Sequence, residues 1–166
     1  MKKTSLYLLF FLFFALLGFA REFFFVNLNN IMYMLYYHNS SSMPVPGIMK
    51  GFMDWPYDTL YYSKYGFTLL CTALYFALSY WALKRLTGRG FFTRVLSYSY
   101  LAFFLLSGLS MLYGYFVKQR LNDEEYTLSR WLMGVLQSPI ICLILLASEK
   151  LYKPAEKDET FNQGVQ

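Results

Sequence analysis

The chain has 166 residues and a formal net charge of +5, but hydrophobic residues make up 57% of it and charged residues only 15%. So few charged residues cannot form the polar surface of a soluble domain of this size, which argues against a soluble enzyme, a disordered tail and a secreted disulfide scaffold. The basic residues flank apolar blocks and do not form a stripe, which argues against nucleic-acid binding. The composition indicates a membrane protein.

The first apolar block predicts a transmembrane helix over about residues 5–26, since roughly 20 mostly apolar residues cross a bilayer. Arg21 and Glu22 interrupt this block, and ionisable residues at such depth are candidates for function. Two interpretations stay open for the pair. Both side chains can reach the outer interface and anchor the helix there, or they form a structural ion pair or a binding site.

The same segment also fits a secretory signal peptide. Lys2 and Lys3 precede an apolar run from Leu6 to Leu17, and small residues around Ala20 fit a cleavage site. The apolar sequence resumes directly after Glu22, which favours a helix that is retained.

An aromatic outer loop is expected at residues 27–58, between the first and second helices. Its stretch Ile31–Tyr37 is too apolar for a solvated linker and is expected to lie on the membrane surface or to cap the bundle. The single histidine, His38, has no second ligand nearby for a metal or a haem. Asp54 or Asp58 is expected to cap the second helix by accepting its free backbone N–H groups.

A second helix over about residues 59–84 and a third over about residues 94–117 are joined by a short basic turn. Both carry small or polar residues on one face, and such residues let membrane helices pack closely and hydrogen-bond to each other. These residues are Thr68, Thr72, Tyr75 and Ser79 on the second helix, and Ser107, Gly108, Ser110 and Gly114 on the third.

The fourth helix is expected over about residues 129–148. Pro139 should kink it and free a backbone carbonyl, because proline has no amide hydrogen. Gln137 lies near the middle of this helix, where its amide must find hydrogen-bond partners within the bundle. Gly134 is expected to permit close packing against a neighbouring helix.

The orientation in the membrane follows from the Lys and Arg residues between the helices. They are more numerous on the side of the N-terminus, notably Lys84, Arg85 and Arg89, so both termini are expected to be cytoplasmic. This orientation puts Arg21 and Arg130 at the outer end of the bundle, where the two guanidinium groups could share one anionic partner.

The predicted fold is an all-α integral membrane four-helix bundle over residues 1–152, followed by a disordered cytoplasmic tail at residues 153–166. Cys71 and Cys142 lie inside apolar blocks and are expected to be buried thiols. No spacing in the sequence is typical of catalytic residues, of metal ligands or of a cofactor site.

Several features together resemble one known family. They are the first helix with Arg21, the aromatic outer loop, the tight basic turn, and a last helix that opens with Arg130 and contains Pro139. This pattern resembles the small exosortase-system-associated membrane proteins of Bacteroidota over most of residues 1–152. The resemblance implies an inner-membrane accessory of a protein-sorting system, beside a polytopic transpeptidase. The Cys, Arg and His residues with which exosortases work are not assembled in this sequence, so catalysis is not carried over.

The expected function is that of a non-enzymatic accessory or scaffold of the bacterial inner membrane, whose partners are lipids and a larger membrane protein. The alternative is a protein or enzyme that binds an amphiphile, such as a lipid-linked or quinone-like molecule, at the outer leaflet. The candidate binding residues are Arg21, Glu22, His38, Asp54, Asp58, Arg130 and Gln137.

Overall fold

The computed structural model describes residues 3–38, 44–117 and 123–151, and the tail expected at residues 153–166 lies outside them. Within these ranges the chain is helical and has no strand. Three helices are long and apolar enough to cross a membrane, and there are four such segments if the bent pair near the C-terminus counts as one span. This number of apolar helices is consistent with a multi-pass membrane protein. The elements are α1 (Lys3–Tyr37), the short 3-10 helix η1 (Gly47–Phe52), α2 (Tyr57–Leu86), α3 (Gly90–Val117), α4 (Asp123–Leu136) and α5 (Ile140–Leu151).

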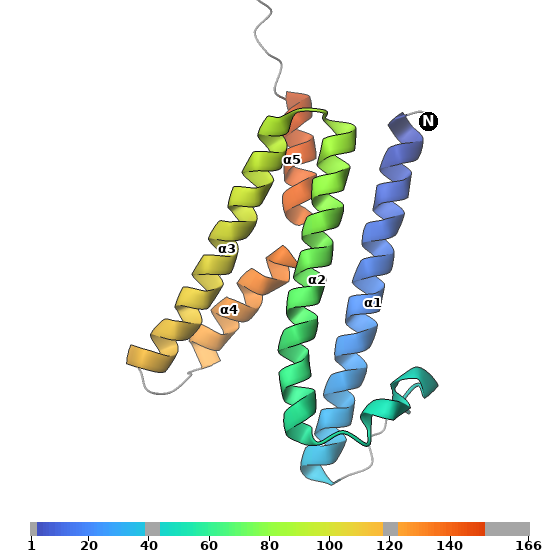
Figure 1. Cartoon of the computed structure of the whole chain (residues 1–166), viewed down its shortest axis with the longest axis vertical. Coiled ribbons are helices and arrows are strands. Elements are labelled where there is room, and N and C mark those ends of the chain that lie inside the picture. Colours follow the sequence, from blue (N-terminus) through green and yellow to red (C-terminus); the bar gives the residue numbers. More distant parts are fainter. Residues whose placement is uncertain (1–2, 39–43, 118–122, 152–166) are drawn as a thin grey trace, which may run out of the picture.

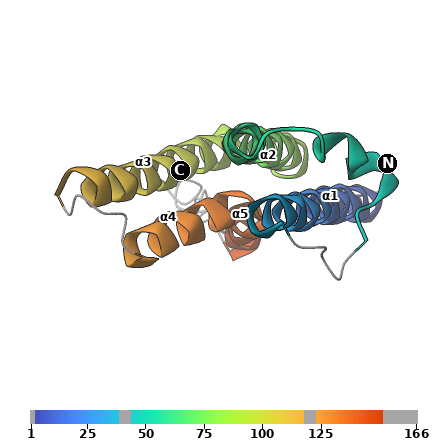
Figure 2. The ribbon, with the colours of Figure 1, turned by 90° about the horizontal axis from the view of Figure 1, so that it is seen from below.

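The helices run up and down and form two layers. Helices α2 and α3 lie in one layer, and α1, α4 and α5 lie in the other (Figure 2). The start of α1, the turn between α2 and α3 and the end of α5 lie together at one end of the molecule (Figure 1). This end is called the basic end, because Lys84 and Arg85 occupy the last turn of α2 there. The opposite end, where α1 stops and α2 begins, is called the cap end.

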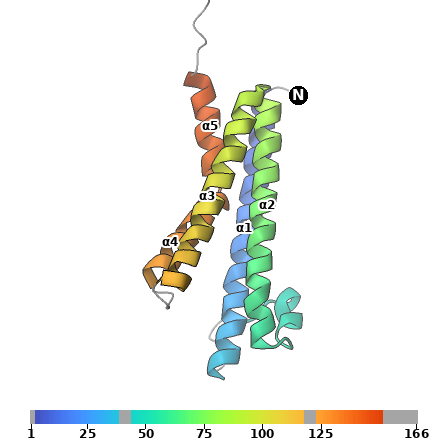
Figure 3. The ribbon, with the colours of Figure 1, turned by 60° about the vertical axis from the view of Figure 1, so that its left-hand side comes forward.

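The first helix is much longer than the sequence predicted, and the expectation of a loop from Asn27 onward is wrong. Helix α1 continues to Tyr37 because its last turns have a hydrophobic core of their own at the cap end. Leu28 and Ile31 are almost fully buried there against partners on η1 and α2. Figure 3 shows η1 lying beside the α1–α2 hairpin. Only the segment between the end of α1 at Tyr37 and the start of α2 at Tyr57, which contains η1, remains of the expected loop.

The start of α2 also differs from expectation. Pro56 occupies the N-cap position, and no side chain accepts a hydrogen bond as a cap there. The prediction that Asp54 or Asp58 caps the helix is thus wrong. Asp58 instead lies in the first helical turn, where a carboxylate interacts favourably with the positive end of the helix dipole.

The turn between α2 and α3 depends on one glycine. Gly88 has a φ of 65°, a left-handed conformation that a residue with a Cβ adopts only with strain. The preceding Thr87 still donates its backbone N–H to the Leu83 carbonyl, so the helix closes just before the chain reverses. The tight basic turn expected from the sequence is confirmed.

The last apolar segment is broken into two helices, and this is a larger change than the expected kink. Segments Leu128–Leu136 and Ile140–Glu149 meet at an angle of 54°, so two helices replace the single one predicted at residues 129–148. Pro139 cannot continue the backbone hydrogen-bond ladder. Ser138 compensates locally, because its hydroxyl donates to the Val135 carbonyl at 2.7 Å.

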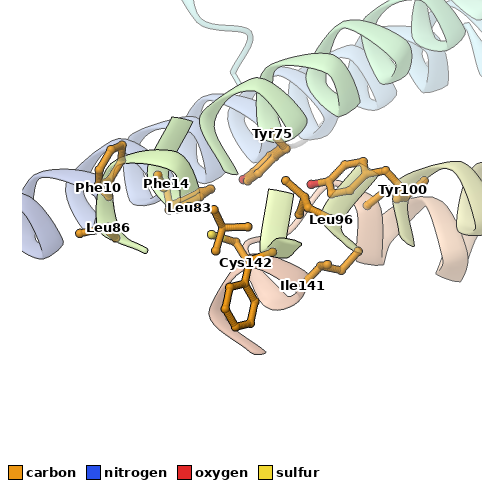
Figure 4. Packing of buried hydrophobic residues seen from close by; sticks show 12 residues of the cluster. Phe10, Phe14, Tyr75, Leu83, Leu86, Leu96, Tyr100, Ile141 and Cys142 are labelled. Carbon is orange, nitrogen blue, oxygen red and sulfur yellow. The ribbon is translucent and has the colours of Figure 1, made fainter. Parts of the chain in front are cut away.

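The main core lies where α1, α2, α3 and α5 meet (Figure 4). On α2, Thr72, Tyr75 and Ser79 are all buried, so the polar stripe predicted on this helix does face the bundle. Cys71 and Cys142 are both free and buried, as expected. A Cβ added at Gly134 would meet nothing within 4 Å, so the expected close packing at that glycine is wrong.

Candidate functional site

A network of polar side chains joins α1, α2 and the break between α4 and α5. The Nε of Arg21 donates to Oε1 of Gln137 at 2.8 Å. The Nε2 of Gln137 in turn donates to the Thr68 carbonyl at 2.9 Å and to Oγ1 of Thr72 at 3.2 Å. Gln137 is only 4% exposed, so one amide satisfies its hydrogen-bonding groups by linking three parts of the chain. The expectation that Gln137 finds partners within the bundle is confirmed.

Local sequence places each member of this network. Arg21 lies seven residues after Phe14, which puts both on the same face of α1, and Phe14 packs in the core. Thr68 and Thr72 are four residues apart on the inner face of α2. Gln137 lies immediately after the end of α4, and the break at Pro139 leaves this residue between the two half-helices.

The surroundings of Arg21 leave part of its guanidinium unused. The group lies 5.7 Å from the centre of the Phe25 ring, a cation–π contact. Gly18, one turn earlier on α1, faces α2 closely, since a Cβ there would come within 3.3 Å of the Tyr75 hydroxyl. Among the described residues, only Nε of Arg21 has a hydrogen-bond partner, and the two Nη groups have none. Arg21 is therefore oriented by Gln137 and retains its two Nη groups as donors for another group.

The depth of the network follows from the lysines on α2. Lys64 and Lys84 are 20 residues apart on this helix. At about 1.5 Å per residue they are separated by about 30 Å, the thickness of the hydrocarbon core of a bilayer. Thr68 lies one turn from Lys64 on the inner side, so in a bilayer bounded by these two lysines the Arg21–Gln137 pair would lie about one turn below the surface at the cap end.

The remaining candidate residues do not join this network. Glu22 is exposed, although it follows Arg21 directly. At the cap end His38, which has a φ of 52°, is exposed, and so are Asp54 and Asp58. In the part of the chain that the structure describes, no three His, Cys, Asp or Glu side chains form a group that could hold a metal ion.

Arg130 is exposed and has a different neighbour from the one expected. Its guanidinium lies near enough to the ammonium of the half-buried Lys64 for the two charges to repel each other. Lys64 is not among the binding residues predicted from the sequence, although its backbone carbonyl accepts a hydrogen bond from Thr68 one turn later on α2. Its spacing of 20 residues from Lys84 matches the length of helix that crosses a bilayer, and this spacing could have singled it out in the sequence.

A second polar contact links α3 and α4. The hydroxyl groups of Ser107 and Ser129 lie 2.7 Å apart, and both residues are buried. The small-residue face predicted on the third helix is confirmed at Ser107. Because the two buried hydroxyl groups hydrogen-bond to each other, this contact links the two helices and is not a candidate ligand site.

The cap end carries an exposed row of tyrosine rings, called the aromatic face. Ring contacts run along it without a break, from Tyr33 to Tyr37 at 4.6 Å and from Tyr36 to Tyr57 at 5.8 Å between centroids. The row ends at Tyr61 and Tyr65, whose hydroxyl oxygens are 2.9 Å apart. All the members are exposed: Tyr33, Tyr36, Tyr37, Tyr57, Tyr61 and Tyr65. The face combines residues from α1 and α2, so it is a product of the hairpin and not of a loop.

Comparison with known proteins adds no relative to this description. No protein-family model matches the chain, and no curated protein or solved structure is significantly similar to it.

Proposed function

We propose that this chain is a non-enzymatic accessory protein of a bacterial inner membrane, which docks onto a larger integral membrane protein through the aromatic face. The observation that carries the proposal is the unbroken row of exposed tyrosine rings across α1 and α2 at the cap end. Tyrosine is enriched in the energetic centres of protein interfaces, because it supplies a large contact area with little loss of conformational entropy.

The rigidity of the cap end supports docking over simple anchoring in the lipid headgroups. The face rests on a buried core in which Leu28, Met49 and Leu60 come from three different elements. An interfacial anchor needs only amphipathic side chains at the right depth, whereas a preorganised surface lowers the entropy lost on binding. Such a supporting core is expected beneath a recognition surface.

The position along the membrane normal also supports the proposal. Helix α1 extends 16 residues beyond Arg21, or about 24 Å at 1.5 Å per residue. In a bilayer bounded by Lys64 and Lys84, Arg21 would lie about one turn below the surface, so the last turns of α1 would reach the headgroup region and the water beyond it. The partner we propose is therefore met at the membrane surface. The positive-inside rule puts the aromatic face on the outer side, and the resemblance to exosortase-associated proteins suggests a polytopic transpeptidase as the partner.

Site-specific photocrosslinking in cells tests this proposal. A photoreactive phenylalanine analogue replaces Tyr36 or Tyr37, which are 63% and 56% exposed on the aromatic face. The matched control replaces Leu109, which is 60% exposed on α3, a helix that contributes no ring to the aromatic face. We expect a discrete adduct with one membrane protein from the two cap-end positions and none from Leu109. Adducts with lipid alone at all three positions would show that the face is only an interfacial anchor.

A further inference from the structure

An apolar pocket of about 200 Å³ lies between the first half of α1 and α5, over the last turns of α2. Helices α1 and α5 lie next to each other in one layer (Figure 2), and both pack on α2. The floor of the pocket is buried and includes Phe10, Ala82 and Leu86. Its rim is exposed and includes Phe11 and Leu143, which are 71% and 53% exposed. A pocket with such a rim opens sideways, toward membrane lipid.

The depth of the pocket matches one leaflet at the basic end. On α1 it extends from Tyr7 to Ala15, which are eight residues or about 12 Å apart. On α2 it reaches Leu86, the last residue of the helix. In a bilayer bounded by Lys64 and Lys84, one leaflet contributes about 15 Å of hydrocarbon. The pocket would therefore take up most of the depth that an acyl chain of this leaflet occupies.

The positive charge beside the pocket belongs to Arg85. This residue comes three positions after Ala82, which lines the pocket, so the two are neighbours on the surface of α2. Lys84 is two positions from both Ala82 and Leu86, and it therefore lies on the opposite face of the helix. Arg85 is exposed and has no hydrogen-bond or ion-pair partner among the described residues. Its guanidinium is thus available to a group at the mouth of the pocket.

The basic end as a whole favours an anion at this mouth. Four cationic residues lie on the last turn of α2, the turn after it and the start of α3: Lys84, Arg85, Arg89 and Arg94. Among the described side chains at this end, the only carboxylate is that of Glu149 on α5. A guanidinium matches the geometry of phosphate, because its planar fork donates two parallel hydrogen bonds. A phosphate group attached to an acyl chain would therefore fit both parts of this surface.

We propose that the pocket and Arg85 bind one anionic phospholipid of the leaflet at the basic end, with its phosphate on the Arg85 guanidinium and an acyl chain along the pocket. The apolar lining suits the chain, since a polar group placed there would lack hydrogen-bond partners. The volume suits a segment of one narrow chain, because pockets for compact drug-sized ligands measure roughly 300–1,000 Å³. The site lies away from the aromatic face and does not depend on the docking proposed above.

Native mass spectrometry of the full chain in mild detergent tests this site. The probes are phosphatidylglycerol and phosphatidylcholine with identical acyl chains, and only the first has a net negative charge. We expect one phosphatidylglycerol to bind at least about tenfold more tightly than phosphatidylcholine. Ala15→Phe adds a ring at the edge of the pocket and should reduce the affinity for phosphatidylglycerol by a similar factor. Ala20→Phe, also exposed on α1 but outside the pocket, is the matched control and should bind as the unaltered chain does.

A pair of charge variants separates this site from general attraction to the basic end. Arg85→Gln should lower the preference for phosphatidylglycerol at least about fivefold, whereas Lys84→Gln removes the same charge from the opposite face and should keep most of the preference. All the substituted positions are exposed, so the variants should fold as the unaltered chain does.

Three results would each overturn the proposal: equal affinity for the two lipids, unchanged binding by Ala15→Phe, or equal losses from Arg85→Gln and Lys84→Gln. A dimer that excludes lipid would also overturn it, because a second copy of the chain would then occupy the pocket.

Discussion

Replacing Gln137 with methionine should destabilise the helical bundle by an amount that the hydrogen bonds of this residue determine. Methionine is nearly as large as glutamine and fills the same space, so the change leaves no sizeable cavity. It removes the acceptor for Arg21 and the donor to Thr68 and Thr72. Thr72 still donates to the Thr68 carbonyl, so neither threonine is left without a partner.

The expected loss is about 2–3 kcal/mol. Two neutral hydrogen bonds between helices contribute about 0.6 kcal/mol each in a membrane protein, because the unfolded chain in the membrane also finds partners. The bond from Arg21 is charge-assisted, and such bonds contribute about 1.5–3 kcal/mol. Since Arg21 is only half-buried, the lower part of this range applies.

A double-mutant cycle measures the link itself. Gln137→Met, Arg21→Met and the double variant are unfolded by increasing SDS in mixed micelles, and the free energies of unfolding are compared. We expect a coupling energy of about 1–2 kcal/mol, because each single variant already breaks the same hydrogen bond. Ser148→Ala serves as the control, since the exposed Ser148 hydroxyl bonds only to a carbonyl of its own helix, and it should change stability very little.

Two results would refute this reasoning. A coupling energy below about 0.3 kcal/mol would mean that Arg21 and Gln137 act independently, as distant residues do. A Gln137→Met variant with a higher free energy of unfolding would also refute it. That result would mean that burying the Gln137 amide costs more free energy than its three hydrogen bonds contribute, as is found for some buried polar groups.

Further predictions concern a turn, the thiols and the orientation. Gly88→Ala should lower the free energy of unfolding by about 1–2 kcal/mol, because the φ of 65° strains any residue with a Cβ. Gly134→Ala should leave the free energy of unfolding unchanged or raise it by up to about 1 kcal/mol, since the added Cβ meets open space inside a helix. Thermal unfolding in detergent compares the two variants, and equal losses of stability would contradict the assignment of the turn. Cys71 and Cys142 are 2% and 0% exposed and should resist N-ethylmaleimide in the folded protein and react after denaturation in SDS; rapid labelling without denaturant would show that the core is open. Ile48→Cys, at a position 86% exposed on η1, should react with a membrane-impermeant maleimide added from outside intact cells; labelling only after lysis would reverse the proposed orientation.

Much of the architecture could be predicted because it depends on neighbours along the chain. The length of the apolar blocks identified α2 and α3 to within a few residues, since the bilayer requires helices of that length. The break in the last apolar segment follows from Pro139, because proline has no amide hydrogen to donate within a helix. That Thr72, Tyr75 and Ser79 are buried on one side of α2 follows from their helical spacing.

What could not be predicted depends on contacts between residues far apart in the chain. The aromatic segment Ile31–Tyr37 reads equally well as a surface loop, and it is helical because Met49 and Leu60 bury its inner face. Tyrosines that are unremarkable one by one form a continuous surface only when α1 and α2 are placed side by side.

The same distinction holds for the site. The composition, with 57% hydrophobic and 15% charged residues, indicates a membrane protein, and the position of Arg21 in an apolar block indicates that it needs a partner. Periodicity cannot say which partner, because Gln137 is 116 residues away and Glu22 is adjacent. The packing of α1 against α2 and the break after α4 bring Gln137 to Arg21 and leave Glu22 and Arg130 exposed. Local physics dictates that a charge in an apolar block needs hydrogen-bond partners, and only the three-dimensional arrangement of the helices selects Gln137 as one of them.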